Sequence, residues 1–139
     1  MKLTSFRICM SIGAMALIGL ALFHFSRYVV LAIALNNNDL QVDLEDSIRA
    51  LWLAFACQAL LIGALYALVA WKPHAVSREV IIILGMLQLV EAVLQSFFAG
   101  SGLVAILLSI AAGFVLVGSI LWPKRLPAAD TVTISGAVR

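Results

Sequence analysis

The chain has 139 residues, of which 64% are hydrophobic and 12% charged, and its formal net charge is +2. Soluble domains average about 45–50% apolar and about 25% charged residues, so this chain has too few polar side chains to cover a water-soluble fold. Together with a mean hydropathy of +1.13, the composition excludes an ordinary soluble domain and predicts a small integral membrane protein.

Four long apolar runs follow one another, at about residues 6–35, 48–71, 80–98 and 103–122. About 20 apolar residues in a helix cross ~30 Å of hydrocarbon, and a helix satisfies its own backbone hydrogen bonds. The predicted fold is therefore all-α: four transmembrane helices in an antiparallel up-down bundle, forming one domain over residues 1–125. We expect residues 126–139 to form a flexible cytoplasmic tail.

The segments between the runs predict where the helices begin and end. The first run would be about 45 Å long as a helix, so we expect it either to leave the membrane near Arg27 or to tilt strongly. The acidic segment 39–46 is expected to be a loop, with Asp46 or Ser47 capping the second helix. Ser77 is the expected N-cap of the third helix. The short turn at residues 100–102 predicts that the last two helices are antiparallel neighbours.

The basic residues predict the orientation in the membrane. Loops rich in Lys and Arg stay in the cytoplasm. If both termini are cytoplasmic, Arg27 and Arg49 face outward, and the other seven of the nine basic residues face inward. The predicted location is the bacterial inner (plasma) membrane, with both termini cytoplasmic. The seven inward-facing residues are Lys2, Arg7, Lys72, Arg78, Lys124, Arg125 and Arg139.

Glu91, in the middle of the third apolar run, is the clearest indication of function. An ionisable group at bilayer depth is costly and usually has a partner or a use. Helix rise places it about 16 Å from the inner start of its helix, near the midplane. Gln95 and Gln88 lie one turn away on either side along the same face.

Further polar residues are expected at similar depth on the other helices. We predict a binding or proton site in a polar pocket in the outer half of the bundle. Two alternatives for Glu91 are structural: an ion pair with Arg27 or His24, or a protonated carboxyl group that forms a hydrogen bond with Gln58. The candidate site residues are His24, Arg27, Arg49, Gln58, Glu91, Gln95 and Ser109.

Small residues recur every four positions in Ala59-x-x-x-Gly63-x-x-x-Ala67 and in Ala105-x-x-x-Ser109-x-x-x-Gly113. Such stripes allow two helices to approach closely. We favour a role inside the bundle over a role in dimer formation.

Motifs for phosphate, dinucleotide or zinc binding do not occur, and the chain has no basic patch for nucleic acid. We therefore predict no catalytic residue, no metal site, no cofactor and no nucleic-acid partner. The expected partners are the lipid bilayer and either a lipid or a hydrophobic small molecule. A homodimer or a larger membrane complex is also an open alternative.

Glu45-Asp46-x-x-Arg49-Ala50 opens an apolar helix after an acidic segment, and an apolar hairpin turns at Gly100-Ser-Gly102. In these features the chain resembles small bacterial four-helix membrane proteins of the DoxX-like kind. The resemblance implies a bacterial inner-membrane protein and leaves the function open. Glu91 departs from what we would expect of that group.

Three functional hypotheses follow. The first is a non-enzymatic accessory subunit or a component that binds a small ligand or lipid. The second is a small proton-coupled transporter that uses Glu91. The third is a membrane enzyme that acts on lipid or quinone, and the absence of a catalytic motif weighs against it.

Overall fold

The structure is a computed structural model that describes residues 2–38, 41–100 and 102–123. It contains α1 (Lys2–Asn36), α2 (Val42–Trp71), α3 (Arg78–Ala99) and α4 (Leu103–Ile120), and these ranges contain no strand. All four helices are long and apolar enough to cross a membrane. The predicted all-α fold, with four helices long and apolar enough to cross a membrane, is therefore confirmed. The predicted tail, 126–139, lies outside the described residues.

Helix α2 begins earlier than predicted, at Val42 instead of residue 48. The prediction that Asp46 or Ser47 caps this helix was wrong. Its N-cap is Gln41, and the Ser47 hydroxyl donates to the Asp43 carbonyl, 2.7 Å away, within the helix. The physical reason is that carboxylates in a first helical turn, here Asp43 and Glu45, are stabilised by the positive end of the helix dipole.

The start of α3 confirms the predicted N-cap. Ser77 has extended backbone angles, and its hydroxyl accepts from the amide of Val80 at 3.4 Å. At the other end of α3, Gly100 has a φ of 81°. Its ψ of 171° places it in a positive-φ extended region that only glycine enters without a steric penalty, so the helix can stop and turn there.

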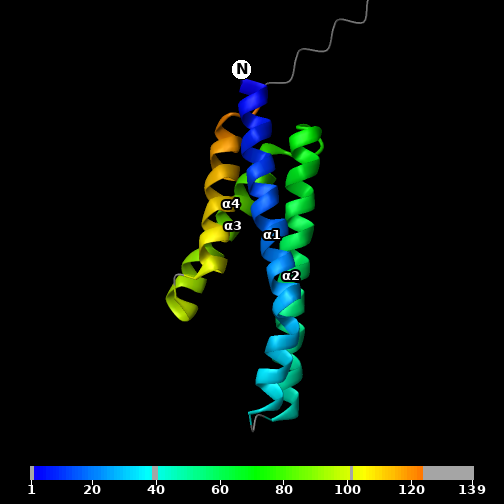
Figure 1. Ribbon diagram of the computed structural model, residues 1–139. Coiled ribbons are helices and arrows are strands. Elements are labelled where there is room, and N and C mark those ends of the chain that lie inside the picture. Colours follow the sequence, from blue (N-terminus) through cyan, green and yellow to red (C-terminus); the bar gives the residue numbers. More distant parts are fainter. Residues whose placement is uncertain (1, 39–40, 101, 124–139) are drawn as a thin grey trace, which may run out of the picture.

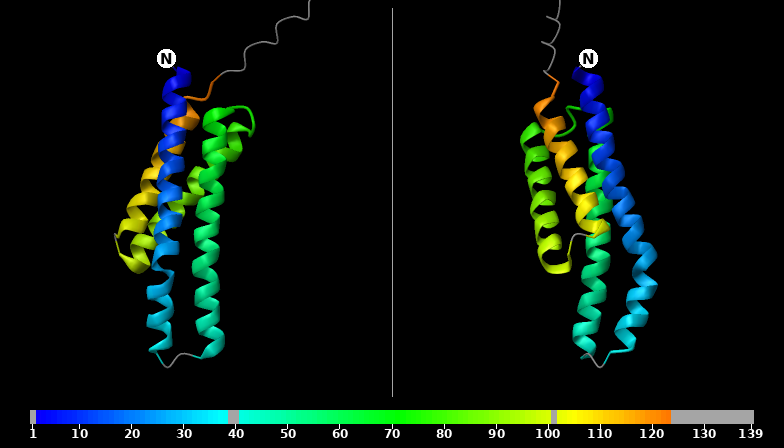
Figure 2. Two further views of the ribbon diagram at one scale, coloured as in Figure 1. Left: turned by 45° about the vertical axis from the view of Figure 1, so that its right-hand side comes forward. Right: turned by 60° about the vertical axis from the view of Figure 1, so that its left-hand side comes forward.

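The four helices form two hairpins of unequal length, and the α1–α2 hairpin extends well past the end of α3 and α4 (Figures 1 and 2). At 1.5 Å per residue, the 35 residues of α1 span about 52 Å, and the 18 residues of α4 span about 27 Å. Backbones approach most closely between α1 and α2, between α1 and α4, and between α3 and α4. Helices α2 and α3 lie farther apart than these pairs.

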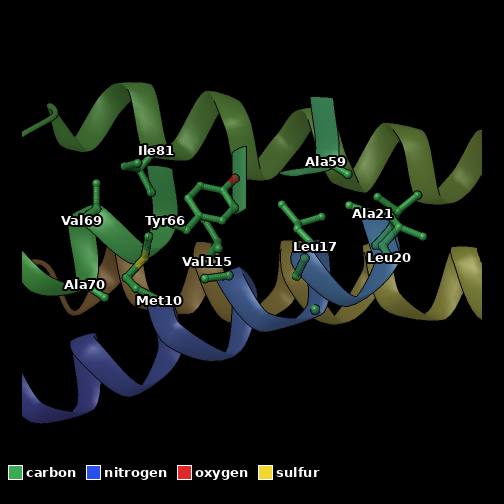
Figure 3. Packing of buried hydrophobic residues seen from close by; sticks show 14 of the residues in the cluster. Met10, Leu17, Leu20, Ala21, Ala59, Tyr66, Val69, Ala70, Ile81 and Val115 are labelled. Atoms are coloured by element: carbon green, nitrogen blue, oxygen red, sulfur yellow. The ribbon is translucent and has the colours of Figure 1, made fainter. Parts of the chain in front are cut away.

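The core lies between the helices in the part where all four overlap. Met10 and Leu17 of α1, Tyr66 of α2 and Val115 of α4 are almost completely buried there (Figure 3). Ile81 contributes from α3. In contrast, many large apolar side chains cover the outside of the bundle, as expected where lipid is the surrounding solvent. Examples are Leu61, Ile83, Phe97 and Phe98.

The two small-residue stripes behave differently. Gly63 is buried against α1, where an added Cβ would lie 3.2 Å from the Ala14 carbonyl oxygen. The first stripe thus contributes to packing inside the bundle. In the second stripe Ala105 is buried, but Ser109 and Gly113 are exposed, and a Cβ at Gly113 would meet nothing within 4 Å.

Candidate functional site

Glu91 and Gln58 form a hydrogen bond between α3 and α2. The Gln58 side-chain nitrogen donates to one carboxylate oxygen of Glu91 at 2.8 Å. Gln58 is exposed on the outside of the bundle, and Glu91 is half-buried beside it. Glu91 is 13 residues from the start of α3 and eight from its end, or about 20 Å and 12 Å along the helix. This polar pair therefore lies on the surface at hydrocarbon depth.

A second polar pair, buried in the bundle, joins the same two helices. The Tyr66 hydroxyl donates to the side-chain oxygen of Gln88 at 2.5 Å. Tyr66 is 0% exposed and Gln88 is 1% exposed, and the Gln88 nitrogen has no hydrogen-bond partner among the described residues. A buried polar atom without a partner is costly in protein or lipid. Among the described residues, the Tyr66 hydroxyl is the hydrogen-bond partner of the Gln88 side chain, so its loss would leave the whole Gln88 amide unpaired.

Both pairs bridge α2 and α3, whose backbones are not closely packed. We call the surface of the bundle that α2 and α3 form together, on the side facing away from the core, the α2–α3 face. It comprises Gln58 and Glu91 together with the exposed Ala54, Leu61, Leu87 and Leu94. Long polar side chains span the space between α2 and α3, and Gln58 and Glu91 form a hydrogen-bonded polar pair on this face, away from the helix ends.

His24 lies in a separate aromatic environment between α1 and α2. Its ring is buried, with ring centroids 4.6 Å from Trp52 and 4.9 Å from Phe55. Its Nδ1 atom is 3.2 Å from the carbonyl oxygen of Leu20, one turn earlier. The Trp52 indole donates to the His24 carbonyl at 2.9 Å. His24 therefore contributes to the contact between α1 and α2.

The two arginines expected in the cluster have other contacts. Arg49 forms an ion pair with Glu45 and lies 3.8 Å from Asp46, on its own helix. It also donates to the side-chain oxygen of Asn36. The bond to Asn36 links the ends of α1 and α2 in the long hairpin. Arg27 is exposed and lies 5.6 Å above the ring of Phe23, which suits a cation–π contact.

Ser109 lines an open groove of about 380 Å³ between α3 and α4. Gln95 is half-buried, one turn beyond Glu91 on α3. The residues that line the groove are Leu89, Ala92, Val93, Ser96, Phe97 and Ser109. Glu91 is absent from this set.

Of the seven predicted site residues, the structure joins Gln58 and Glu91 directly. Of the structural alternatives for Glu91, the hydrogen bond to Gln58 is the one observed. The sequence prediction did not include Tyr66. Residue counting along the two helices could have placed the Tyr66 hydroxyl at the depth of Gln88. Whether the two groups meet depends also on how each helix is rotated about its axis, which the sequence does not give.

The chemistry available at the α2–α3 face is hydrogen bonding and charge pairing. Gln58 is the hydrogen-bond partner that the structure gives to Glu91 among the described residues, so the other carboxylate oxygen can accept from a further donor. Neither a nucleophile with an adjacent base nor a second carboxylate accompanies Glu91 in the described contacts. The arrangement is suited to binding.

Comparison of the chain with protein-family models, with curated proteins and with solved structures found no match.

Proposed function

We propose that this protein is a non-enzymatic subunit of a membrane assembly, and that its α2–α3 face binds another membrane-spanning chain. The observation that carries this proposal is the hydrogen bond between Gln58 and Glu91 on the exposed side of the helix bundle. Lipid tails offer no hydrogen-bonding groups, so exposed amide and carboxylate atoms at this depth favour a polar partner.

The setting of this face also supports contact with another helix. Ala54 and Leu61 on α2, and Leu87 and Leu94 on α3, are exposed apolar residues on either side of the polar pair. Polar groups surrounded by apolar side chains are a common arrangement between membrane helices, where the polar atoms give specificity and close packing gives affinity.

The proposed setting is the bacterial inner membrane, with the helices alternating in direction and both termini in the cytoplasm. The distribution of basic residues supports this orientation, because Lys72 and Arg78 flank one connection and Arg27 and Arg49 are the basic residues of the opposite end. The DoxX-like resemblance agrees with a bacterial membrane protein. In this orientation, the Asn36 end of the long hairpin is the outer end.

Lipid or small-ligand binding is the second candidate, favoured by the open groove between α3 and α4. Apolar side chains line most of this groove, and the Ser96 and Ser109 hydroxyls could orient a polar head group. Transport by protonation of Glu91 and chemistry on lipid or quinone have no comparable observation in their favour.

Site-specific photocrosslinking in native membranes tests the proposed docking. A benzophenone amino acid placed at Leu61, on the α2–α3 face, is expected to give adducts with protein. The matched control is Met15 of α1, which is equally exposed, at 72% against 71% for Leu61. The proposal predicts protein adducts at Leu61 and lipid adducts alone at Met15. Lipid adducts alone at both positions would overturn it.

A further inference from the structure

We propose that the chain bound at the α2–α3 face is a second copy of this protein, and that Gln58 of each copy donates a hydrogen bond to Glu91 of the other. This inference rests on the proposed function, because it identifies the partner of the same face. It makes the Gln58–Glu91 pair the centre of a symmetric homodimer.

Symmetry determines which residues meet in such a dimer. Two copies inserted with the same orientation are related by a two-fold axis along the membrane normal, so each residue keeps its depth. When the two α2–α3 faces meet across this axis, α2 of one copy lies opposite α3 of the other. Because Gln58 and Glu91 are hydrogen-bonded, they lie at one depth. Gln58 therefore faces Glu91 of the second copy.

The remaining hydrogen-bonding capacity of the two side chains matches this arrangement. A glutamine amide has two N–H donors, and a carboxylate has two oxygens. One donor of Gln58 and one oxygen of Glu91 are used within the chain at 2.8 Å. The second donor and the second oxygen are left for the other copy. The dimer would thus contain a closed ring of four hydrogen bonds, without placing the two carboxylates directly against each other.

The residues around the pair fit a self-complementary contact. Along the helices, Leu61 lies three residues from Gln58, and Leu87 lies four residues from Glu91 in the same direction along the bundle. Ala54 and Leu94 are similarly placed on the other side. All four are exposed and apolar. Leu61 of one copy therefore lies at the same depth as Leu87 of the other copy and faces it across the two-fold axis. Ala54, with its small side chain, allows the two copies to approach closely.

Disulfide crosslinking between two differently tagged copies tests this arrangement. Both copies carry Cys9→Ala and Cys57→Ala, since these are the two native cysteines. One copy carries Leu61→Cys and the other Leu87→Cys, and both are expressed in the same membrane. We expect mild oxidation to produce a covalent dimer with both tags. The control replaces Leu61→Cys with Met15→Cys, an exposed position on α1, and should give no dimer.

The polar pair is tested in the same assay. Glu91→Gln keeps a side-chain oxygen that accepts from Gln58, so the yield of crosslinked dimer should remain above half of the unmodified yield. Glu91→Leu removes the acceptors of both hydrogen bonds between the copies and should lower the yield about tenfold, a factor that corresponds to about 1.4 kcal/mol. Equal yields for both variants would overturn the role of the pair.

The two proposals fail in distinguishable ways. Protein adducts from the photocrosslinker at Leu61, without any dimer carrying both tags, would overturn the homodimer and leave docking to a different chain. Lipid adducts alone, with no dimer, would overturn both. A doubly tagged dimer that forms equally well with Met15→Cys would show association without the predicted face, and would also overturn the inference.

Discussion

Tyr66 and Gln88 form a hydrogen bond between α2 and α3 in the interior of the bundle. Their hydrogen bond is completely buried, and the Gln88 nitrogen has no partner among the described residues. The Gln58–Glu91 bond joins the same helices at the surface. The buried pair contributes to stability within one chain, whereas the exposed pair is the one that we propose binds a neighbouring chain.

Tyr66→Phe should destabilise the fold. It removes the only partner given to Gln88 among the described residues, so we expect the free energy of unfolding to fall by about 1 kcal/mol. The double variant Tyr66→Phe with Gln88→Leu should recover most of this loss, because replacing both partners leaves no buried polar group unpaired. Unfolding titrations in mixed detergent micelles measure both. A double variant less stable than Tyr66→Phe would contradict the explanation.

At the scale of helices, glycine position controls how closely α1 and α2 pack. A Cβ at Gly63 would lie 3.0 Å from the Ile18 side chain and 3.2 Å from the Ala14 carbonyl oxygen, whereas one at Gly113 meets nothing within 4 Å. These two mid-helix glycines form a matched comparison, because both lie inside small-residue stripes on membrane-spanning helices.

Gly63→Ala should lower the free energy of unfolding by about 1–3 kcal/mol, since α1 and α2 must move apart to accommodate the methyl group. Gly113→Ala should leave stability unchanged or raise it by up to about 1 kcal/mol, because alanine has the higher helix propensity. The same detergent titration compares the two. Equal losses for both variants would show that close approach at Gly63 is unimportant.

The helices themselves were largely predictable from sequence, because length and continuous hydrophobicity decide whether a segment crosses a membrane. The N-cap at Ser77 was predictable from local chemistry alone. The start of α2 was not, because the acidic residues after Gln41 are typical of a loop and also suit the first turn of a helix.

The contacts of the site were less predictable. Depth along a helix follows from residue count, so the similar depth of Gln58 and Glu91 could be estimated. Which polar groups meet also depends on how each helix is rotated about its axis. His24 instead packs on Trp52, and Arg49 pairs with Glu45. The packing of the whole bundle sets the rotation of each helix, and this rotation decides which side chains are in contact.

At the scale of the whole molecule, the two hairpins differ in reach. The α1–α2 hairpin extends past the end of α3 and α4 (Figures 1 and 2). If the shorter hairpin matches the thickness of the hydrocarbon, the segment of α1 around Ile33 lies beyond it, on the outer side in the proposed orientation. The hydrogen bond from Arg49 to Asn36 links α1 and α2 at that end.

Cysteine labelling tests this placement. In a chain without its native cysteines, Ile33→Cys should react with a membrane-impermeant maleimide added outside intact spheroplasts. Val90→Cys, on the exposed surface of α3 beside Glu91, should not react, because lipid surrounds it. His74→Cys, in the connection before α3, should react only after permeabilisation. Labelling of His74→Cys in intact spheroplasts, with Ile33→Cys protected, would reverse the proposed orientation.

The central claim is that the exposed Gln58–Glu91 pair joins two copies of the chain. The most direct measurement is to count subunits by stepwise photobleaching of singly labelled protein reconstituted at low density in lipid vesicles. We predict two bleaching steps for the native chain and for Glu91→Gln, and mainly one step for Glu91→Leu. Single steps for the native chain, or two steps for Glu91→Leu, would contradict the account.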